Sequence, residues 1–581
     1  MIVYRKTREI RETMPFADEL FALADLAGKG LSHEHATELL MEAGRFESGL
    51  ADAFFPERDG ICEESSALRS ASLAAGRLFC ASWEGRRDEA GKWAALFNEM
   101  LSEALRTGLP ERMETRIPEG YAHYGLFPEV YLASARDFFM DRGRCHVVCI
   151  GLRSIGASLS SIVSAALESL GCQTVSFTLR PRGHPFKRKA VLTPELEEIV
   201  SCLRGSVFII ADEGPGLSGS SFSSVAQKLK SLGVPDNNVV FFPSWIPDGS
   251  SFLSKAAREG WGNHPKYASF FENVWLESGR LEKEARLESA PMDISAGMWR
   301  GLFYKDGQDE ADYPAAHPRH ERRKYLGRGA GGKTLMLKFA GHGRYGASKL
   351  GRAALLAGEG FTPPVSGFTN GFVIHEFISG RPVTERELNQ LLIDEMARYS
   401  AFLKRNFPAG ERMSFEEFHC MAARNIALGL GEDWARKAAP LERMCGVYEG
   451  FEPVKLDGRM FPFEWIITAK GYRKTDCLDH HLDQFFPACQ DIAWDLAMAA
   501  VEFEMNPMEL NYMLSRYAAA SGDTVDNERF RLHLIAYLAF RLGYSSFASE
   551  ELAATPEGPR FRSLAHRYAS RLKRELLWLS D

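Results

Sequence analysis

Two adjacent carboxylates stand between a short apolar segment and a loop rich in glycine and serine. Residues 207–211 are apolar throughout, which predicts a strand buried on both faces of an α/β sheet. Asp212 and Glu213 follow at its carboxyl end, where open α/β sheets bind ligands. The loop 214–221 holds three Gly and three Ser, so its backbone can approach an anion and donate hydrogen bonds where a helix begins. These residues predict a phosphate-binding loop beside two carboxylates.

The order of apolar strand, acidic pair and Gly/Ser-rich loop resembles the 5-phosphoribosyl-1-pyrophosphate (PRPP) motif of type I phosphoribosyltransferases. The resemblance implies that Asp212 and Glu213 are catalytic acids that contact the ribose hydroxyls. It also implies that the 5-phosphate is held by Gly216, Ser218, Gly219, Ser220 and Ser221. The chain departs from the usual motif in having Glu as second acid, Gly-Pro where apolar residues are common, and one extra loop residue. An ordinary strand-to-helix turn is the alternative interpretation.

Two further loops follow predicted strands in the order that the resemblance implies. Loop 151–157 is similar to the family's pyrophosphate loop, which assigns pyrophosphate binding to Arg153, Ser154 and Gly156. Residues 180–189 contain five cations and correspond to the family's mobile basic loop. There the resemblance assigns phosphate contacts to Arg180, Arg182, Lys187 and Arg188. A solvated charged surface is the alternative interpretation of such a run.

The elements around these loops alternate between strand and helix. Strands are expected at 146–151, 174–179, 207–211 and 238–242, and helices at 157–170, 195–203 and 220–232. This alternation predicts a mostly parallel, doubly wound sheet. We therefore expect an α/β multidomain protein with a helical N-terminal region at 1–115, a phosphoribosyltransferase-like domain at 116–250, a helical connector at 251–296 and a bilobal α+β kinase-like domain at 297–581.

The second half contains Gly327-Arg-Gly-Ala-Gly-Gly-Lys-Thr334, a literal match to the P-loop pattern. Its context differs, because an apolar strand follows it where a P-loop needs a helix. A Gly-rich turn followed by a strand with Lys338 resembles instead the small lobe of the aminoglycoside phosphotransferase and choline kinase group. Asp491-Ile-Ala-Trp-Asp-Leu-Ala497 is similar to that group's Asp-Leu-Ala helix start.

The kinase resemblance implies a nucleotide site with Lys338 and Glu376, a catalytic Asp457, and Mg²⁺ ligands at Glu464 and Asp476. Three departures from the group put phosphoryl transfer in question, two of them in its His-Gly-Asp-x-x-x-x-Asn pattern. Leu456 precedes the proposed catalytic Asp in place of His, Glu464 stands seven residues after it instead of five, and Lys349 occupies a helix position where Glu is expected. A nucleotide-binding or scaffold remnant is the alternative.

Size and charge set the remaining expectations. The chain has 581 residues, 45% hydrophobic residues and a net charge of -7, so it can bury several cores and does not suggest a nucleic-acid or anionic-membrane ligand. No apolar run is long enough for a signal peptide or a membrane span, which indicates a cytoplasmic protein. The ten Cys are scattered and favour reduced thiols.

The function expected from the sequence is transfer of 5-phosphoribosyl between pyrophosphate and a nitrogen base, in either direction. Carboxylates beside the ribose and cations around the departing pyrophosphate suit an oxocarbenium-like transition state. Mg²⁺ is the expected cofactor, with PRPP as substrate, and ATP as a further substrate if the second half is active. The partner is a phosphorylated small molecule, and a homo-oligomer is left open. The alternative is a nucleotide- or PRPP-sensing regulatory protein without turnover.

Overall fold

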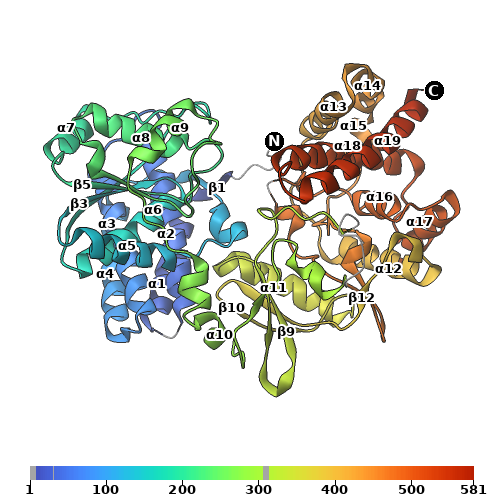
Figure 1. Cartoon of the computed structure of the whole chain (residues 1–581), viewed down its shortest axis with the longest axis horizontal. Coiled ribbons are helices and arrows are strands. Elements are labelled where there is room, and N and C mark those ends of the chain that lie inside the picture. The colour runs from blue at the N-terminus through green and yellow to red at the C-terminus, as the bar shows by residue number, and fades with distance from the viewer. Residues whose placement is uncertain (1–7, 31, 305–312, 484, 581) are drawn as a thin grey trace.

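The computed structural model describes residues 8–30, 32–304, 313–483 and 485–580 (Figure 1). The first half, blue to green in Figure 1, is built on a four-stranded parallel sheet of order β4-β3-β5-β6. Its strands are β3 (His146–Leu152), β4 (Gln173–Leu179), β5 (Val207–Ala211) and β6 (Val239–Phe242). The helices that join them are α6 (Ile155–Ser169), α7 (Pro194–Cys202) and α8 (Ser220–Ser231). The predicted strands and helices are thus confirmed to within two residues.

Both faces of this sheet are covered, as its continuous apolar strands require. Along β5 the side chains of Phe208 and Ile210 enter the core under α7 and α8, whereas those of Ile209 and Ala211 enter the opposite core with α6. This alternation is the two-residue period of a strand. The parallel, doubly wound sheet that the sequence predicts is therefore present.

The N-terminal helices lie on the α6 face of the sheet. They are α1 (Thr13–Gly28), α2 (His33–Phe54), α3 (Glu63–Trp83) and α4 (Arg87–Arg106), followed by α5 (Glu129–Arg142). Helices α2 and α3 contact α6, and α1 and α4 pack on α2 and α3. At Gly76 in α3 a Cβ would lie 2.6 Å from the Ser161 carbonyl oxygen, so glycine permits the close approach of α3 to α6. The N-terminal region thus shares one core with the sheet.

A strand pair lies at the ends of this helical region, where the sequence predicts only helix. β1 (Arg8–Glu12) pairs antiparallel with β2 (Arg112–Arg116). The sequence Arg-Glu-Ile-Arg-Glu of β1 has a single apolar residue, and Ile10 is exposed. The apolar alternation that signals a strand is therefore missing, and only the pairing with a partner a hundred residues away defines the strand.

The second half begins with a five-stranded antiparallel sheet of order β10-β11-β9-β8-β7. The strands are β7 (Met292–Asp293), β8 (Lys324–Arg328), β9 (Thr334–Phe339), β10 (Val365–Thr369) and β11 (Phe372–Glu376). The P-loop-like sequence falls in the connection between β8 and β9, which pair as antiparallel neighbours. Helix α11 (Gly343–Gly358) follows β9 and packs on β10 and β11.

A mostly helical lobe completes the chain, yellow to red in Figure 1. It contains a three-stranded sheet of β12 (Arg381–Pro382), β13 (Trp465–Thr468) and β14 (Gly471–Lys474). Its helices are α12 (Gln390–Asn406), α13 (Phe415–Leu430), α14 (Glu432–Lys437), α15 (Cys445–Glu449), α16 (Ala493–Glu502), α17 (Pro507–Ser521), α18 (Asn527–Glu551) and α19 (Glu557–Ser580). The second half is thus a small sheet lobe followed by a larger helical lobe.

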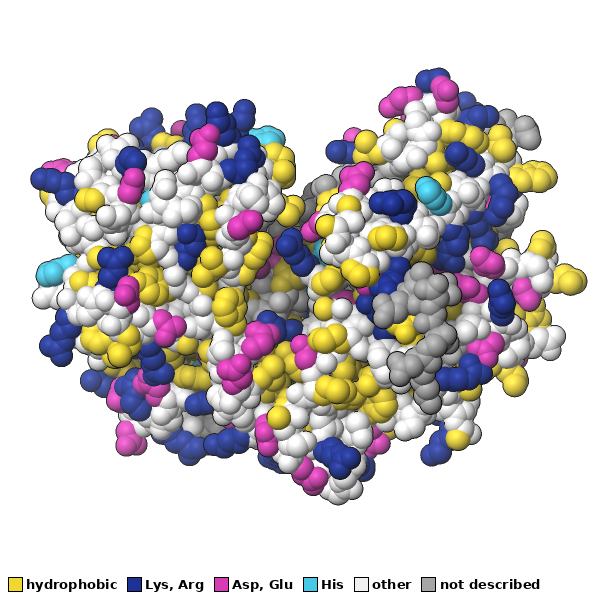
Figure 2. All heavy atoms as spheres, in the orientation of Figure 1, with side chains coloured by type: hydrophobic (Ala, Val, Ile, Leu, Met, Phe, Trp, Pro, Cys, Tyr) yellow, Lys and Arg dark blue, Asp and Glu magenta, His cyan; other side chains and the backbone are white. Residues whose placement is uncertain are grey.

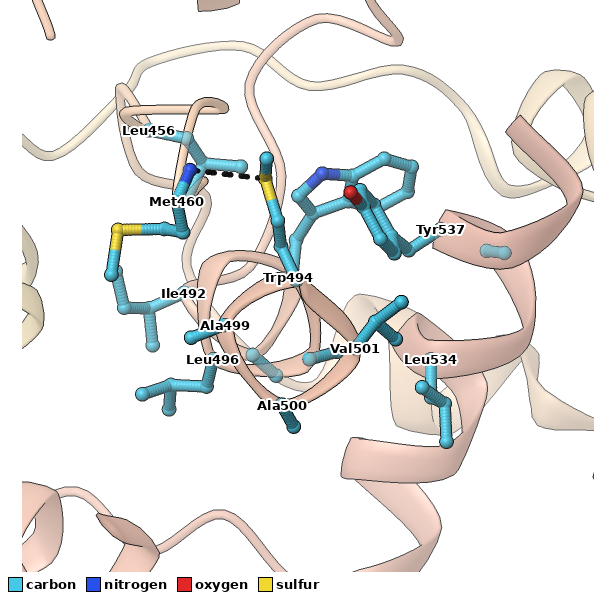
Figure 3. Packing of buried hydrophobic residues seen from close by; sticks show 14 of the residues in the cluster. Leu456, Met460, Ile492, Trp494, Leu496, Ala499, Ala500, Val501, Leu534 and Tyr537 are labelled. Carbon is cyan, nitrogen blue, oxygen red and sulfur yellow. Dashed lines mark hydrogen bonds between the residues drawn. The ribbon is translucent and has the colours of Figure 1, made fainter. Parts of the chain in front are cut away.

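Helix α16 is buried on all sides and anchors a loop of the site described below. Figure 3 shows Trp494 and its neighbours packed between α18 and the loop that carries Leu456 and Met460. The Met460 N–H donates to the Met498 sulfur at 3.3 Å. This buried helix therefore fixes the backbone of the loop 456–460.

The two halves meet through a continuous apolar core. Phe127 stacks on Phe372 of β11, with ring centroids 5.8 Å apart, and Phe339 of β9 belongs to the same cluster. Short connector helices α9 (Lys255–Gly260) and α10 (Arg280–Glu284) lie between the halves in sequence. Figure 2 shows basic and acidic side chains interspersed over one face, which is hollowed between the two halves. Among the described residues, none of the helices combines the length and apolar composition needed to cross a bilayer.

Candidate functional site

The three predicted phosphate-binding loops meet at the carboxyl edge of the parallel sheet. Arg180 Nη1 donates to the Arg153 carbonyl oxygen at 2.8 Å, which joins loop 180–189 to loop 151–157. Ser220 Oγ donates to the Pro185 carbonyl oxygen at 2.6 Å, which joins loop 180–189 to loop 212–221. Segments that the sequence only orders along the chain are therefore neighbours in space.

The acidic pair is held from both sides of the sheet edge. Tyr131 of α5 donates its hydroxyl to the Asp212 carbonyl oxygen at 2.7 Å, and Ser244 donates its hydroxyl to the Glu213 carbonyl oxygen. Burial raises the pKa of Asp212 to about 7. Burial, and then the charge of Asp212, raise the pKa of Glu213 to about 8. Both acids therefore exchange protons near neutral pH, a property found often at functional sites.

Glu213 rests against a turn that the sequence did not single out. This turn is the π-helix Gly120–Tyr124, and the Gly120 N–H hydrogen bond to Glu213 opposes the rise of its pKa. A Cβ at Gly120 would lie 2.7 Å from Glu213 Cδ, so only glycine leaves space for the carboxylate. A glycine far from the motif gives no local signal of this contact.

The Gly/Ser loop leads into α8 as predicted. Ser218 Oγ lies 3.0 Å from Ser220 Oγ and accepts the Ser220 N–H at 3.2 Å. Gly216 and Gly219 both have positive φ, at 57° and 63°, where glycine is favoured. Ser220 is buried and its hydroxyl is committed to Pro185, whereas Gly216 is exposed and Ser218 and Ser221 are partly exposed. The accessible donors of the predicted 5-phosphate loop are therefore on Ser218 and Ser221.

The arginines assigned to pyrophosphate are paired with two acids of the N-terminal region. Arg153 pairs with Asp59 and lies 3.1 Å from Asp52, Arg182 lies 2.9 Å from Asp59, and Arg180 Nε donates to Asp52 at 2.9 Å. The side chain of Arg153 is only 2% exposed, so direct contact with a bound phosphate conflicts with its position. Sequence reasoning missed both acids, because Asp52 and Asp59 carry no pattern that connects them to the loops.

The other two residues assigned in loop 151–157 have structural contacts. The Ser154 carbonyl oxygen accepts the Ser48 hydroxyl at 3.2 Å. A Cβ at Gly156 would lie 2.5 Å from the Ala211 carbonyl oxygen, so this glycine allows the start of α6 to approach β5. Gly156 is explained by packing alone.

Positive charge remains in excess around these loops. Arg116 of β2 has its pKa lowered to about 10 by burial and then by Arg180, and burial together with Arg180 also lowers the pKa of Arg188. In the described parts of the chain, no carboxylate lies within ion-pair distance of either side chain. Lys187 is exposed. Five guanidinium groups (Arg116, Arg153, Arg180, Arg182 and Arg188) thus face two carboxylates (Asp52 and Asp59), an excess of three positive charges that favours an anionic ligand.

A second cluster lies in the kinase-like half, between the small sheet and the helical lobe. Lys338 of β9 pairs with Asp476 and lies 3.7 Å from Asp479. Although burial opposes it, these two carboxylates raise the pKa of Lys338 above its ordinary value. Lys349 of α11 lies 3.2 Å from Asp479, and burial lowers its pKa to about 8. Lys349 therefore forms an ion pair with Asp479 of the large lobe. A Glu, which the resemblance implies at this position, would instead pair with Lys338.

Asp457, the predicted catalytic base, is fully buried. Its carboxylate lies 3.1 Å from Lys474 Nζ and accepts the Tyr399 hydroxyl at 3.0 Å, and both members of the ion pair are 0% exposed. The backbone N–H groups of Asp457 and Gly458 donate to Asp495 of α16 at 2.9 and 3.0 Å. Burial, with the charge of Asp457, raises the pKa of Asp495 to about 7. A substrate cannot reach this carboxylate, so its position conflicts with the role of catalytic base.

Arg459 lies close to both predicted metal ligands, Glu464 and Asp476. It stands five residues before Glu464, which is the spacing between Asp and Asn in His-Gly-Asp-x-x-x-x-Asn. Its Nη2 lies 2.6 Å from Glu464 Oε1 and 3.8 Å from Asp476 Oδ2. Counting back from Glu464 would have found this register, in which Asp457 falls on the His position and Arg459 on the Asp position.

The cleft beside this cluster contains two adjoining cavities. A cavity of about 90 Å³ is lined by Lys338, Arg459, Glu464, Asp476 and also Glu376. Glu376 Oε1 accepts from Lys333 Nζ at 2.6 Å. A larger cavity of about 400 Å³ shares Arg459 and is lined with tyrosines and arginines of α18 and α19. The predicted nucleotide-site residues Lys338 and Glu376 therefore line one cavity.

The residues of this cleft do not fit a Mg²⁺ ion. Asp476, Asp479 and His480 have ligand atoms within 4.8 Å of one another, a spacing that a metal would accept. Both carboxylates, however, are already in ion pairs with lysines, and Glu464 is paired with Arg459. Mg²⁺ needs carboxylate oxygens that are not neutralised by neighbouring cations. The metal-ligand roles predicted for Asp476 and Glu464 conflict with this arrangement.

Comparison with known proteins gives neighbours among solved structures, which cover about half of the chain or less. No protein-family model matches the sequence, and a search of curated proteins found no match. Solved structures that are similar include choline kinase LicA from Streptococcus pneumoniae (18% identity, TM-score 0.30, covering 42% of this chain and 89% of that one). Ethanolamine kinase from Plasmodium vivax (11%, 0.31, 43% and 79%) and macrolide 2'-phosphotransferase MphH from Brachybacterium faecium (17%, 0.31, 42% and 88%) are others.

These neighbours are named as kinases and a phosphotransferase, and they match 42% to 43% of the chain. TM-scores of this size describe a partial likeness, and no statement about function follows from them. The neighbours named here are kinases, and they give no support for a phosphoribosyltransferase.

Proposed function

We propose that the chain is a phosphoribosyltransferase-type enzyme that binds PRPP with Mg²⁺ at the acidic pair and transfers 5-phosphoribosyl to or from a nitrogen base. The observation that carries the proposal is the meeting of loops 151–157, 180–189 and 212–221 at one edge of the parallel sheet. A ligand at that edge would have carboxylates on one side and an excess of cations on the other. This charge pattern suits a sugar that carries phosphate groups.

Each part of the edge has a chemical role in this proposal. Asp212 and Glu213 accept hydrogen bonds from the ribose hydroxyls and stabilise positive charge at the anomeric carbon. Ser218, Ser221 and the first amides of α8 bind the 5-phosphate. The guanidinium excess at Arg116 and Arg188 attracts the pyrophosphate. Asp212 and Glu213 carry the carboxylate oxygens that would hold Mg²⁺, and the ion would neutralise part of the phosphate charge.

A second candidate is a protein that senses PRPP or a nucleotide without turnover. The pairing of Arg153, Arg180 and Arg182 with Asp52 and Asp59 favours it, because these cations are already neutralised in the free protein. A ligand would have to compete with the two aspartates for them. Binding would then move the N-terminal helices relative to the loops, which is a means of signalling.

Pyrophosphate release separates the two candidates. With PRPP, Mg²⁺ and a panel of purine, pyrimidine and other nitrogen bases, we expect release with at least one base. We expect Asp212→Asn together with Glu213→Gln to lower that rate about 100-fold or more, since it removes charges that act at the transition state. An equal rate of pyrophosphate release in the variant would exclude a role of Asp212 and Glu213 in the transfer. If PRPP binds but no base causes pyrophosphate release, the result would support the sensor.

A further inference from the structure

We propose that the cleft of the kinase-like half is a metal-independent binding site for a phosphorylated ligand, in which Arg459, Lys324 and Lys338 take the place of a divalent cation. The site is separate from the PRPP edge and does not depend on it. The starting observation is the disagreement between the kinase-like fold, which implies Mg²⁺, and the side chains that stand around Asp476.

The first step is the charge of the connected network. Its ion pairs, each within 4 Å, join five cations (Arg322, Lys324, Lys338, Lys349 and Arg459) to four carboxylates (Glu464, Asp476, Asp479 and Asp483). Every carboxylate of this network is therefore already paired with a cation. A divalent cation would have to displace a lysine or an arginine, whereas phosphate oxygens would meet cationic donors.

The second step is the access of these cations to a ligand. Lys324, Lys338 and Arg459 all line the cavity of about 90 Å³, and Arg459 also lines the larger cavity beside it. Asp476 holds the three together, at 3.4 Å from Lys324 and 3.8 Å from Arg459. The three donors thus converge on one point from three different elements, which is a preorganised arrangement for phosphate oxygens.

The third step concerns the apolar residues of the same cavity. Ile294, Met336, Phe377 and Ile466 line it together with the charged groups. A ligand with a flat apolar part and a phosphate would therefore contact both kinds of group.

Asp457 is buried, and the four carboxylates that line the cavity already have donors. Glu464 pairs with Arg459, Asp476 pairs with Lys324 and Lys338, and Glu376 pairs with Lys333. Glu321 accepts from Trp299 Nε1 and from the Gly297 N–H. The ligand is therefore bound and its phosphate is not transferred.

Binding of ADP and ATP, measured by calorimetry with either EDTA or Mg²⁺, tests the proposal. The protein carries Asp212→Asn and Glu213→Gln throughout, so that a nucleotide at the PRPP edge does not contribute and failure of one proposal leaves the other unaffected. We expect binding in EDTA that Mg²⁺ does not strengthen, and no loss of the ATP γ-phosphate. A requirement for Mg²⁺, phosphate transfer, or no binding in either buffer would overturn the proposal.

Variants at Arg459 identify the group responsible. Arg459→Asp should weaken binding in EDTA by about tenfold or more and make binding respond to added Mg²⁺, because it exchanges a cation for a carboxylate. Arg459→Lys keeps the charge and should stay within about threefold of the parent. The unfolding temperature of each variant without ligand checks that it is folded. Equal affinities in all three proteins would contradict the role of Arg459.

Discussion

At about pH 9, the Asp212→Asn, Glu213→Gln variant is expected to be more stable than the wild type, and the advantage should vanish at about pH 4. Folding raises the pKa of Asp212 from 3.8 to about 7 and that of Glu213 from 4.5 to about 8. At a pH between the unfolded and the folded pKa of each acid, that acid has lost its proton in the unfolded chain and keeps it in the folded chain. The stability contributed by the neutral acids is therefore complete below pH 4 and is lost as the pH rises through 7 and 8.

The amides of the variant do not ionise, so they keep that contribution at every pH. Each raised pKa corresponds to about 4–5 kcal/mol as an upper limit. Because both acids are partly exposed, we expect a total of about 2–4 kcal/mol, which is on the order of 5–10 °C in unfolding temperature for a module of this size.

Calorimetric unfolding from about pH 4 to about pH 9 measures this difference, with Glu259→Gln as the control. Glu259 is an exposed acid of α9 that lies 3.7 Å from Lys255. The control should follow the wild type at every pH. An acid-pair variant whose stability difference does not change with pH would show that the pKa values of Asp212 and Glu213 are ordinary.

Lys474→Met is expected to destabilise the second half by about 3–5 kcal/mol, since it leaves the Asp457 carboxylate buried without its cation. Lys474 and Asp457 are both 0% exposed and 3.1 Å apart. Methionine replaces the aliphatic part of the lysine, so the loss arises from the unpaired charge more than from a cavity. Unfolding in denaturant measures the change.

A second substitution distinguishes the two causes. Adding Asp457→Asn to Lys474→Met removes the charge but keeps an acceptor for the Tyr399 hydroxyl. We expect this double variant to regain most of the lost stability, because replacing both members of a buried ion pair with neutral groups costs little. A double variant as unstable as Lys474→Met would mean that packing, and not charge, explains the loss.

Local sequence pattern was sufficient for the strands and helices of the parallel sheet and for the position of the acidic pair. The run 207–211 is apolar at every position, so it predicts a strand with two covered faces, and β5 is such a strand. Asp212 follows at its carboxyl end, which fixes the sheet edge where the loops meet. These features depend on residues that are adjacent in the chain.

Features that depend on distant partners were not predictable in the same way. Arg153 pairs with Asp59, which lies 94 residues away in the sequence. The residue types alone do not indicate which oppositely charged residue will be the partner. The burial of Asp457 follows from Lys474 in β14 and from Asp495 in α16. Its predicted role came from a count that began at Asp457, whereas counting five residues back from Glu464 leads to Arg459.

The central claim, that PRPP binds between the acidic pair and the basic loops, is tested most directly by titrating PRPP with Mg²⁺ into the protein in a calorimeter. We expect heat of binding in the wild type and none in the Asp212→Asn, Glu213→Gln variant. Asp52→Asn should bind more tightly, by about fivefold, because Asp52 no longer competes for Arg180. Equal heats in the wild type and the acid-pair variant, or no heat in the wild type, would contradict the claim.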